Sequence, residues 1–301
     1  MKKIIIDDLE EPKRIDAFIA EYLQDISRSK IQAEIKSGNI IVNSKNTKPS
    51  YILKENDEIE FLENLSNTKI TPQEIPLEII WEDENMLVVN KPSGMLTHPT
   101  TTEKEGTLVN ALLFKYGENL SDINGEFRRG IVHRLDRNTS GLLMIAKNND
   151  THNYLAEAIK NKKITKKYLA VVKGIIEKDE LIINKPIGRN PNQPHKMAIM
   201  DNGKESISDV KVLERYKDAT LVEVKLITGR THQIRVHMAS ISHPVFNDTL
   251  YGFGKMKIKT QEQVLQSYKL EFQKPFTNEK ICLEIPFDNK LTKVINFLKS
   301  S

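Results

Sequence analysis

The chain has 301 residues and a net charge of +4, with 39% hydrophobic and 29% charged residues. This balance is typical of a soluble globular protein, and the length is sufficient for two domains. No run of about 18 apolar residues occurs, which excludes a membrane-spanning helix, and the mild positive charge permits nucleic-acid binding without requiring it.

The N-terminus and the single cysteine both indicate the cytoplasm. Three isoleucines at 4–6 follow two lysines but end at Asp7, which is too short for a signal peptide and predicts a first strand. Cys282 cannot form an internal disulfide, which fits a reducing compartment. No histidine or acid lies directly beside Cys282 to activate its thiol, so we interpret it as an ordinary strand residue.

Residues 1–66 contain the elements of a small module. Apolar residues recur at helical spacing over 14–23, and Ser27 is placed to cap a second helix over 28–36 that ends at Gly38. Short strands are expected over 39–43 and 57–62. Residues 1–63 carry 10 Lys and Arg against 13 Asp and Glu, a net charge of −3, yet the stretch from 28 to 48 is locally basic.

This pattern resembles a known RNA-binding module. The string Ser-Arg-Ser-Lys-Ile-Gln at 27–32, with Ile-Lys-Ser-Gly at 35–38 and Ile-Val-Asn at 41–43, is similar to the module named after a ribosomal small-subunit protein. The resemblance implies that Arg28, Lys30 and Lys36 lie on an RNA-binding face. Without it, these side chains would be ordinary solvated charges on a helix.

A proline-containing linker at 67–76 is expected to separate the module at 1–66 from a second domain at 77–301. In that domain, strands are expected over 77–81, 86–90, 141–147, 167–174, 219–228 and 279–285, and helices over 108–116, 153–160 and 232–240. The irregular spacing of these strands favours an α+β fold.

A charge-dense loop precedes the strand that begins at Gly141. Its sequence at 133–138 is His-Arg-Leu-Asp-Arg-Asn, so Asp136 lies between Arg134 and Arg137, whose charges favour the ionised carboxylate. Loops held by rigid strands are common positions for reactive side chains. From these residues alone, a structural Asp–Arg pair and a catalytic carboxylate are equally good interpretations.

The longer string resembles an enzyme signature. His-Arg-Leu-Asp followed by Arg-Asn-Thr-Ser-Gly-Leu-Leu is similar to the signature of the pseudouridine synthases that act on large-subunit ribosomal RNA, the RluA/RluD type. Further blocks at 82–95, 98–99, 167–174 and 228–237 extend the resemblance, with the front module, over nearly the entire chain. It implies a catalytic domain with a mixed, mainly antiparallel sheet, preceded by a small α/β RNA-binding module.

The resemblance also implies roles for single residues. Asp136 is the essential carboxylate, and Arg235 pairs with it. Tyr168 stacks on the target uracil and can share in the final proton removal, and Arg134 enters the gap left when the nucleotide flips out. RNA is the implied partner, and no cofactor is needed because the isomerisation is redox-neutral. Other expected RNA contacts are Arg137, Arg230, Lys162 and Lys163. The two lysines belong to a cluster just before Tyr168 that also contains Lys160, Lys166 and Lys167.

Simpler interpretations exist for several of these side chains. Tyr168 taken alone is a core or edge tyrosine, and the lysine cluster taken alone is a solvated face. Arg230 and Arg235 near a helix start are usually solvated or contact phosphates. Thr231 is expected to cap the helix that carries Arg235.

Metal and nucleotide chemistry lack support in the sequence. The seven histidines are scattered, and none has the Cys or Glu-x-x-His partners of a metal site. Neither a Gly-x-Gly-x-x-Gly turn nor a phosphate loop occurs. We therefore expect no metal and no cofactor, and nothing in the sequence requires more than a monomer.

Four residues at three places in the chain depart from the family pattern. Gln266-Ser267 replaces the usual His-Ala, Lys274 replaces a frequent histidine, and Asn247 replaces the glycine that usually precedes Asp248. None of the four is an expected catalytic residue, so the departures bear on substrate identity more than on activity.

Two other functions were weighed against the synthase. A non-catalytic RNA-binding factor of ribosome assembly needs the front module and basic residues but has no need of Asp136. An RNA N-glycosidase would cleave the same bond but release free uracil.

Overall fold

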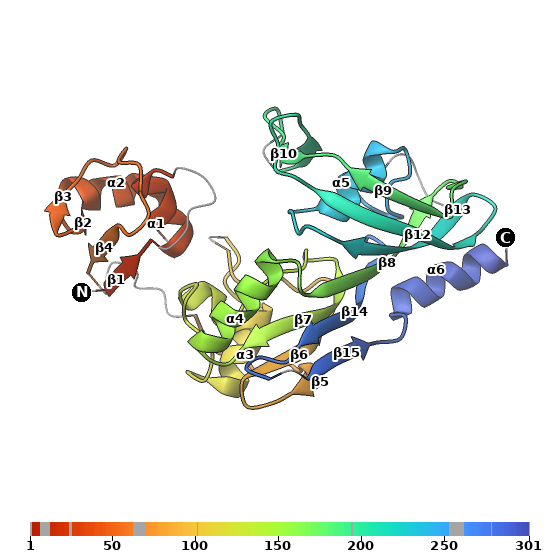
Figure 1. The fold of residues 1–301 in the computed structure, drawn as a ribbon, viewed down its shortest axis with the longest axis horizontal. Coiled ribbons are helices and arrows are strands. Elements are labelled where there is room, and N and C mark those ends of the chain that lie inside the picture. The colour runs from red at the N-terminus through yellow and green to blue at the C-terminus, as the bar shows by residue number, and fades with distance from the viewer. Residues whose placement is uncertain are drawn as a thin grey trace. The chain divides into compact units, whose positions relative to one another are not determined.

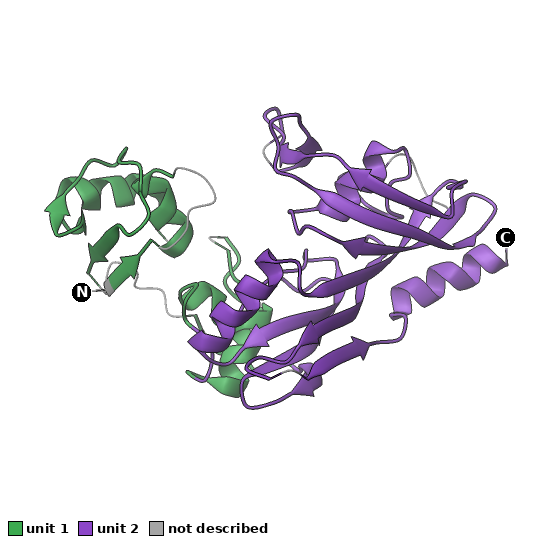
Figure 2. Cartoon of the chain, viewed as in Figure 1, with its two compact units in different colours: residues 1–75, 98–118, 122–129 green, residues 76–97, 119–121, 130–301 purple. Residues whose placement is uncertain are grey.

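A computed structural model of the chain describes residues 2–6, 13–23, 26–62, 70–100, 102–193, 195–252, 262–277 and 279–300. The chain forms two compact units (Figure 2), one of residues 1–75, 98–118 and 122–129 and one of residues 76–97, 119–121 and 130–301. The domain boundaries expected at 66 and 76 remain a prediction, and residues 67–69 of the expected linker lie outside the described residues.

Most elements of the front module follow from local sequence rules, although the two-residue strand at 45–46 was not expected. Helix α2 (Arg28–Lys36) follows Ser27, whose hydroxyl accepts the backbone N–H of Lys30, and the chain leaves it through Gly38 at φ +79°. Helix α1 (Ile15–Leu23) packs beside it. An antiparallel sheet has the order β1-β4-β2-β3, formed by β1 (Lys2–Ile5), β4 (Glu58–Phe61), β2 (Ile40–Val42) and β3 (Lys45–Asn46).

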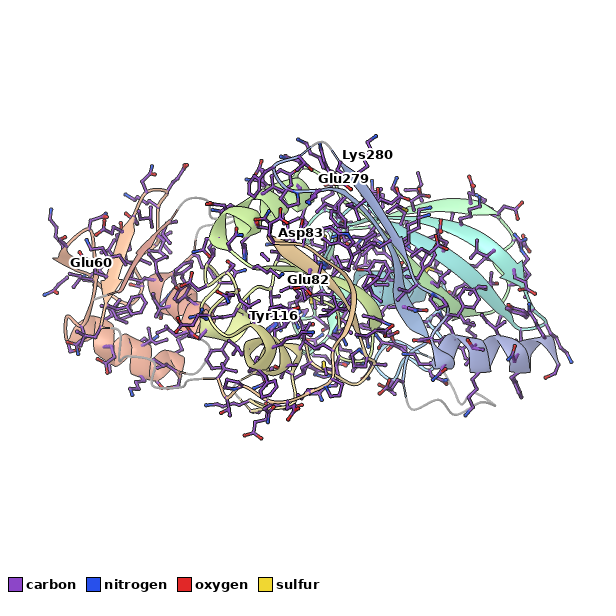
Figure 3. All side chains as sticks on the ribbon, turned by 90° about the horizontal axis from the view of Figure 1, so that it is seen from below. Glu60, Glu82, Asp83, Tyr116, Glu279 and Lys280 are labelled. Atoms are coloured by element: carbon purple, nitrogen blue, oxygen red, sulfur yellow. The ribbon has the colours of Figure 1, made fainter. Side chains whose placement is uncertain are left out.

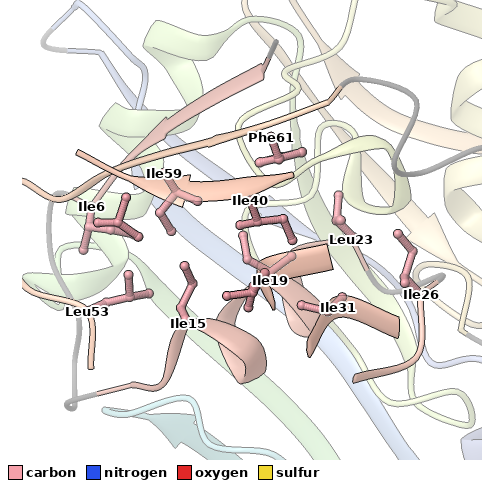
Figure 4. Packing of buried hydrophobic residues seen from close by; sticks show 12 residues of the cluster. Ile6, Ile15, Ile19, Leu23, Ile26, Ile31, Ile40, Leu53, Ile59 and Phe61 are labelled. Carbon is pink, nitrogen blue, oxygen red and sulfur yellow. The ribbon is translucent and has the colours of Figure 1, made fainter. Parts of the chain in front are cut away.

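One apolar cluster joins these helices to the sheet. Ile15, Ile19 and Ile31 on the helices meet Ile59 and Phe61 of β4 in its centre (Figure 4), and all five side chains are buried. Burial of such side chains is worth roughly 1.5–3 kcal/mol each, so the module has a core of its own. Elsewhere in the same unit, α3 (Leu108–Tyr116) starts at a capping box formed by Thr107 and Asn110, and η2 (Glu126–Arg128) is a short 3-10 helix.

The second unit is built on a twisted sheet of nine described strands (Figure 1). Its order is β5-β6-β7-β14-β8-β13-β12-β9, with β15 paired to β14, and every described pair except β7–β14 is antiparallel. The α+β fold with a mixed, mainly antiparallel sheet is therefore confirmed. The strands are β5 (Glu78–Glu82), β6 (Met86–Lys91), β7 (Ser140–Ala146), β8 (Thr165–Lys173), β9 (Glu180–Asn184), β12 (Ile207–Arg215), β13 (Ala219–Leu226), β14 (Leu265–Gln273) and β15 (Lys280–Glu284).

The sequence did not predict all of these elements. Strands β9, β12 and β14 and the small hairpin of β10 (Ile187–Arg189) and β11 (Met197–Ile199) were missed, as was the C-terminal helix α6 (Asn289–Lys299). Helix α4 (Asn149–Lys160) begins four residues before its expected start because Asn148 caps it. The turn out of β5 is fixed by Asp83 (Figure 3), whose Oδ1 accepts the backbone N–H groups of Asn85 and Met86.

The sheet has two differently used faces. Leu169 and Val171 of β8 point toward α6 and pack with Leu291 and Val294 in one core cluster. Side chains alternate along a strand, so Tyr168 points to the opposite face. Helix α5 (Gln233–Ser240) packs against β12. In the described residues, no helix is long and apolar enough to cross a membrane.

Candidate active site

The loop of residues 133–139, here called the Asp136 loop, is held by hydrogen bonds on both sides of Asp136. The hydroxyl of Thr97 donates to the carbonyl of Leu135 at 2.9 Å and accepts the N–H of the same residue at 3.4 Å. The N–H of Thr139 donates to the carbonyl of Asp136 at 3.1 Å, which closes a turn. These bonds leave the Asp136 side chain 20% exposed, so substrate can reach it.

A buried lysine supports the same loop from below. Lys91 at the end of β6 has no exposed surface, and its ammonium donates to the carbonyls of Pro92, Met95 and Arg137 at 2.8–3.0 Å. Burial, and after it the charge of Lys290, lowers the pKa of Lys91 to about 7. The three carbonyl acceptors match the three donors of an ammonium group.

A close crossing of two strands explains the glycine that follows the loop. Gly141 has φ +114°, and a Cβ at this position would lie 2.0 Å from the carbonyl oxygen of Ser267. The two residues are register partners in the parallel pair β7–β14. Only glycine allows this approach, and it fixes the place where the chain leaves the Asp136 loop.

The Asp136 carboxylate forms an ion pair with an arginine far away in sequence. Arg235 of α5 donates from Nη1 to Asp136 Oδ2 at 3.0 Å. The same guanidinium donates from Nε and Nη2 to both oxygens of Asp248, at 2.6 and 3.0 Å. Burial opposes the charge of Arg235, but the two carboxylates outweigh it and raise the arginine pKa. A buried arginine held by Asp248 thus presents one N–H edge to Asp136.

A histidine and a tyrosine complete this cluster. His232 Nε2 lies 3.8 Å from Asp136 Oδ2, and its Nδ1 lies 2.8 Å from the hydroxyl of Tyr251. That hydroxyl accepts the N–H of Met197, so it is free to donate to Nδ1, which favours the tautomer with its proton on Nε2. The Tyr251 ring also lies 5.1 Å from the Arg235 guanidinium carbon. Sequence reasoning missed both residues.

Tyr168 lies on the same side of the sheet as α5. Residues that are register partners on neighbouring strands point to the same face of a sheet. Tyr168 is the register partner of Val224, and Val224 is the partner of Val210 on β12, the strand against which α5 packs. Its side chain is 94% buried, and burial raises the pKa of its hydroxyl despite a hydrogen bond with Ser267. The hydroxyl therefore stays protonated at neutral pH.

The arginines beside Asp136 in sequence are placed differently from Arg235. The side chains of Arg134 and Arg137 are exposed, whereas that of Arg235 is buried. Lys162 and Arg230 meet at Glu205: Lys162 Nζ lies 3.8 Å from its carboxylate, and Arg230 Nε donates to its backbone carbonyl at 3.1 Å. Lys163 and Lys162 lie at the exposed turn that follows α4.

In the front module, a buried carboxylate organises the basic face. Asp16 is fully buried and accepts hydrogen bonds from Arg14, Arg28 and Gln32. Burial raises its pKa, but these three donors outweigh that effect and hold the pKa well below its usual range. An open hollow beside it is lined by Arg14, Gln32, Lys36, Thr47, Lys48, Pro49 and Ser50. Lys36 was expected at the RNA face; Arg14 and Asp16 were missed, and Lys30 is exposed outside this hollow.

One expectation about α5 is wrong. Thr231 does not cap this helix, because the N-cap residue is His232, in the left-handed region at φ +57° and without a side-chain cap. The preceding turn is instead closed by Gln233, whose Oε1 accepts the Thr228 hydroxyl and the Arg230 N–H at 2.8 and 3.0 Å. This turn places Arg235 two residues into the helix.

The departures from the family pattern have local structural explanations. Asn247 has φ +56°, a conformation that asparagine adopts more readily than most residues, so it can stand where glycine is usual. Gln266 donates to the carbonyl of Pro286 and accepts the N–H of Asp288, and Lys274 pairs with Asp83 at 3.1 Å. None of these side chains bonds to Asp136 in the described structure.

The geometry alone permits either a structural ion pair or a reactive carboxylate at Asp136. Comparison with known proteins identifies the family of the chain. Residues 85–240 match the family model described as RNA pseudouridylate synthase, and residues 13–59 match the S4 domain. The chain belongs to the RNA pseudouridylate synthase family. It is an enzyme that isomerises uridine in RNA, as the resemblance predicted, and its front module is an S4 domain.

Full-length relatives agree with this assignment. The chain is 40% identical to "Uncharacterized RNA pseudouridine synthase YlyB" of Bacillus subtilis, over 100% of both chains. It is 34% identical to "Ribosomal large subunit pseudouridine synthase D" of Xanthomonas campestris, over 99% of this chain and 93% of that one. Among solved structures, "Human RNA Pseudouridylate Synthase Domain Containing 1" superimposes with a TM-score of 0.59 at 26% identity, covering 75% of this chain and 96% of that one.

Proposed function

We propose that this synthase modifies one or more uridines of large-subunit ribosomal RNA and that Asp136 is its catalytic carboxylate. The observation that supports the role of Asp136 is its position: a partly exposed carboxylate, fixed by Arg235 and close to Tyr168. The substrate class rests on relatives at 33–37% identity over most of this chain whose names specify the ribosomal large subunit.

The isomerisation requires a balanced exchange of bonds. The bond between N1 of uracil and C1′ of the ribose breaks, the base turns, and a bond between C5 and C1′ forms. C5 then loses its proton and N1 gains one, so no electrons or groups are exchanged with a cofactor. Three first steps are open to the Asp136 carboxylate: attack at C1′ of the sugar, attack on the ring, or abstraction of a sugar proton.

The neighbouring residues have distinct roles in this proposal. Arg235 holds Asp136 in one orientation, and Asp248 holds Arg235. Tyr168 stacks on the target uracil. Because its hydroxyl stays protonated, it is better suited to donate a hydrogen bond than to act as the base that removes the C5 proton. Arg134, exposed at the start of the Asp136 loop, enters the gap that the flipped nucleotide leaves.

The remaining basic residues bind the RNA backbone in this proposal. Lys162, Lys163, Arg137 and Arg230 contact the strand near the target, and Arg28, Lys30 and Lys36 contact a second region through the S4 domain. We further propose that the enzyme acts as a monomer in the cytoplasm, because its own chain supplies every residue of the site described above.

Pseudouridine mapping tests this proposal directly. RNA from cells lacking the gene is sequenced after carbodiimide treatment, and the lost position is restored by wild-type protein but not by Asp136→Asn. The exposed carboxylate of Asp218 offers a matched control, and Asp218→Asn should restore the signal fully. Equal signals from wild type and Asp136→Asn would refute the catalytic role of Asp136 and favour an RNA-binding assembly factor. Release of free uracil, detected by chromatography, would indicate an N-glycosidase.

A further inference from the structure

Lys166 is a buried cation without a partner. Its residue is 8% exposed, and among the residues that the structure describes, none gives its ammonium a hydrogen bond or an ion pair. The other buried lysines near the site differ from it. Lys91 has three carbonyl acceptors, and Lys290 donates to the Ser93 hydroxyl and to the carbonyl of Asn138, both at 3.0 Å.

The position of Lys166 links it to the reaction. It lies on β8 two residues before Tyr168, so the two side chains share the face of the sheet opposite to α6. A Cβ on Gly229 would lie 3.5 Å from Lys166 Nζ, which places the ammonium against the backbone of that exposed residue. The amine therefore lies at the rim of the face that carries Tyr168.

In the part of the chain that the structure describes, no acidic group compensates the charge of Lys166. Burial, and after it the charge of Lys166, lowers the pKa of His133 to about 3, so this neighbouring ring is neutral. His133 Nε2 accepts the N–H of Met144 at 2.9 Å, and the histidine is thus engaged in holding the Asp136 loop. Burial also lowers the pKa of Lys166 itself, as expected for a cation that lacks a nearby carboxylate.

Other cations lead from the surface toward this amine. Arg230 follows Gly229 directly, and Glu205 joins Arg230 to the exposed Lys162. Lys162, Arg230 and Lys166 form a basic track that ends two residues from Tyr168. The Glu205 carboxylate lies 3.8 Å from Lys162 at the outer end, whereas Lys166 is buried at the inner end.

We propose that Lys166 binds the phosphodiester group that flanks the target uridine. This inference rests on the proposed function, because it requires an RNA strand whose target base reaches Tyr168. A buried ammonium is stabilised by an anion much more than by a neutral acceptor such as a uracil carbonyl, and phosphate is the anion that every nucleotide carries. The ammonium that has no partner in the free enzyme thereby forms an ion pair with RNA at the target nucleotide, and this ion pair favours binding.

The first experiment compares activity and stability in the same variants. With a ribosomal RNA fragment that wild type modifies, Lys166→Met should lower kcat/KM by about 30-fold, the range expected when one partner of a buried charge pair is removed. Lys166→Arg keeps the charge and should recover part of the loss. Lys293→Met, which removes an exposed lysine on α6, should match wild type.

Thermal unfolding separates a binding role from a structural one. Because Lys166 has no partner in the described protein, Lys166→Met removes a buried charge without breaking a bond, and the Tm should be unchanged or higher. A lysine that merely stabilised the fold would show the opposite result, with a lower Tm and an activity that recovers at lower temperature. That result would overturn the proposal.

The second experiment identifies the phosphate. Methylphosphonate linkages, which are neutral, are placed singly on the 5′ and 3′ sides of the target uridine in the same fragment. One of the two neutral linkages should lower kcat/KM of the wild-type enzyme by about as much as the Lys166→Met substitution does. The same linkage should cause no further loss of kcat/KM in the Lys166→Met variant. Equal losses in wild type and in Lys166→Met at both linkages would refute the assignment.

Failure of this inference is distinguishable from failure of the proposed function. A wild-type protein that modifies no ribosomal RNA fragment would remove the proposed substrate. An active wild type with an equally active Lys166→Met would leave that function intact and refute only the role of Lys166.

Discussion

The S4 domain and the catalytic domain each combine arginine with aspartate, but in opposite arrangements. In the S4 domain the acid is buried: Asp16 has no exposed surface, whereas Arg14 and Arg28, which it holds, have side chains 43% and 50% exposed. In the catalytic domain the arginine is buried: Arg235 is 5% exposed, and Asp136 is the more accessible partner at 20%.

From this difference we expect two different tasks. A buried acid that orients exposed guanidinium groups displays positive charge to phosphates, which suits binding. A buried guanidinium that orients a partly exposed carboxylate displays a reactive group, which suits chemistry. Variants at the two buried centres should therefore affect different steps, and the following predictions test that separation.

Replacing Arg235 should have the largest effect. Arg235→Met leaves Asp248 as an uncompensated buried charge and should lower the free energy of unfolding by about 3–5 kcal/mol. The loss of orientation at Asp136 should lower kcat by about 10³-fold, with little change in RNA affinity. Urea unfolding and single-turnover kinetics measure these quantities. Arg215→Met is the matched control, because it removes an arginine outside the site that donates to Asp179 and to the carbonyls of Ile176 and Glu177. A change confined to RNA affinity would contradict the separation of tasks.

Lys91→Met should have the next largest effect, because it removes the donor to the carbonyl of Arg137 in the Asp136 loop. A displacement of this loop should lower kcat by roughly 10- to 100-fold. The pH dependence of stability gives a second readout. The pKa of Lys91 is about 7 in the folded protein against 10.5 when unperturbed, so the unfolded chain binds the proton more tightly between these values.

It follows that Lys91 makes the free energy of unfolding of wild type rise with pH between about 7 and 10.5. Lys91→Met lacks this contribution. Urea unfolding of both proteins at pH 7 and pH 9.5 measures the difference, and parallel pH dependence in the two would contradict the assigned pKa.

Asp16→Asn should affect binding and leave chemistry intact. Without the buried carboxylate, Arg14 and Arg28 lose their fixed orientation, and RNA affinity should fall about tenfold while kcat at saturating RNA stays constant. The pKa of Asp16 is lowered by folding, so its stabilising contribution is present above its unfolded pKa and is lost as pH falls further. Filter binding and saturation kinetics distinguish the two steps; a loss in kcat would refute the assignment of Asp16 to binding.

The smallest effects should come from single exposed cations of the S4 domain. Arg28→Ala should weaken RNA binding about threefold, because Asp16 holds this guanidinium in place. Lys30 is exposed, and among the described residues its side chain has no ion pair like that of Arg28 with Asp16. Lys30→Ala should therefore weaken binding about twofold or less. The reverse order in a binding titration would contradict the proposed function of the buried acid.

Local rules predicted much of the fold. Helix α2 follows from the Ser27 cap, apolar spacing and Gly38, and α3 has the predicted bounds, because caps and periodicity act within a few residues. Strands β9, β12 and β14 were missed because the side-chain pattern of a strand within a large sheet depends on which face its neighbours cover. Thr231 was misassigned because a left-handed His232 and the Gln233 side chain replace the expected cap.

The sequence by itself determined the reaction, because the string around Asp136 and the S4 pattern are continuous and need no fold to be recognised. Only the tertiary structure decided the geometry of the pair that the resemblance implied. Arg235 bonds to Asp136 across 99 positions of the chain, and Asp248 holds its guanidinium in place. The pairing of β8, β13 and β12 contributes to that approach, and burial strengthens the bond. Burial also leaves Lys166 without an anion among the residues that the structure describes. Burial and distance depend on the whole sheet, and no local stretch of sequence encodes them.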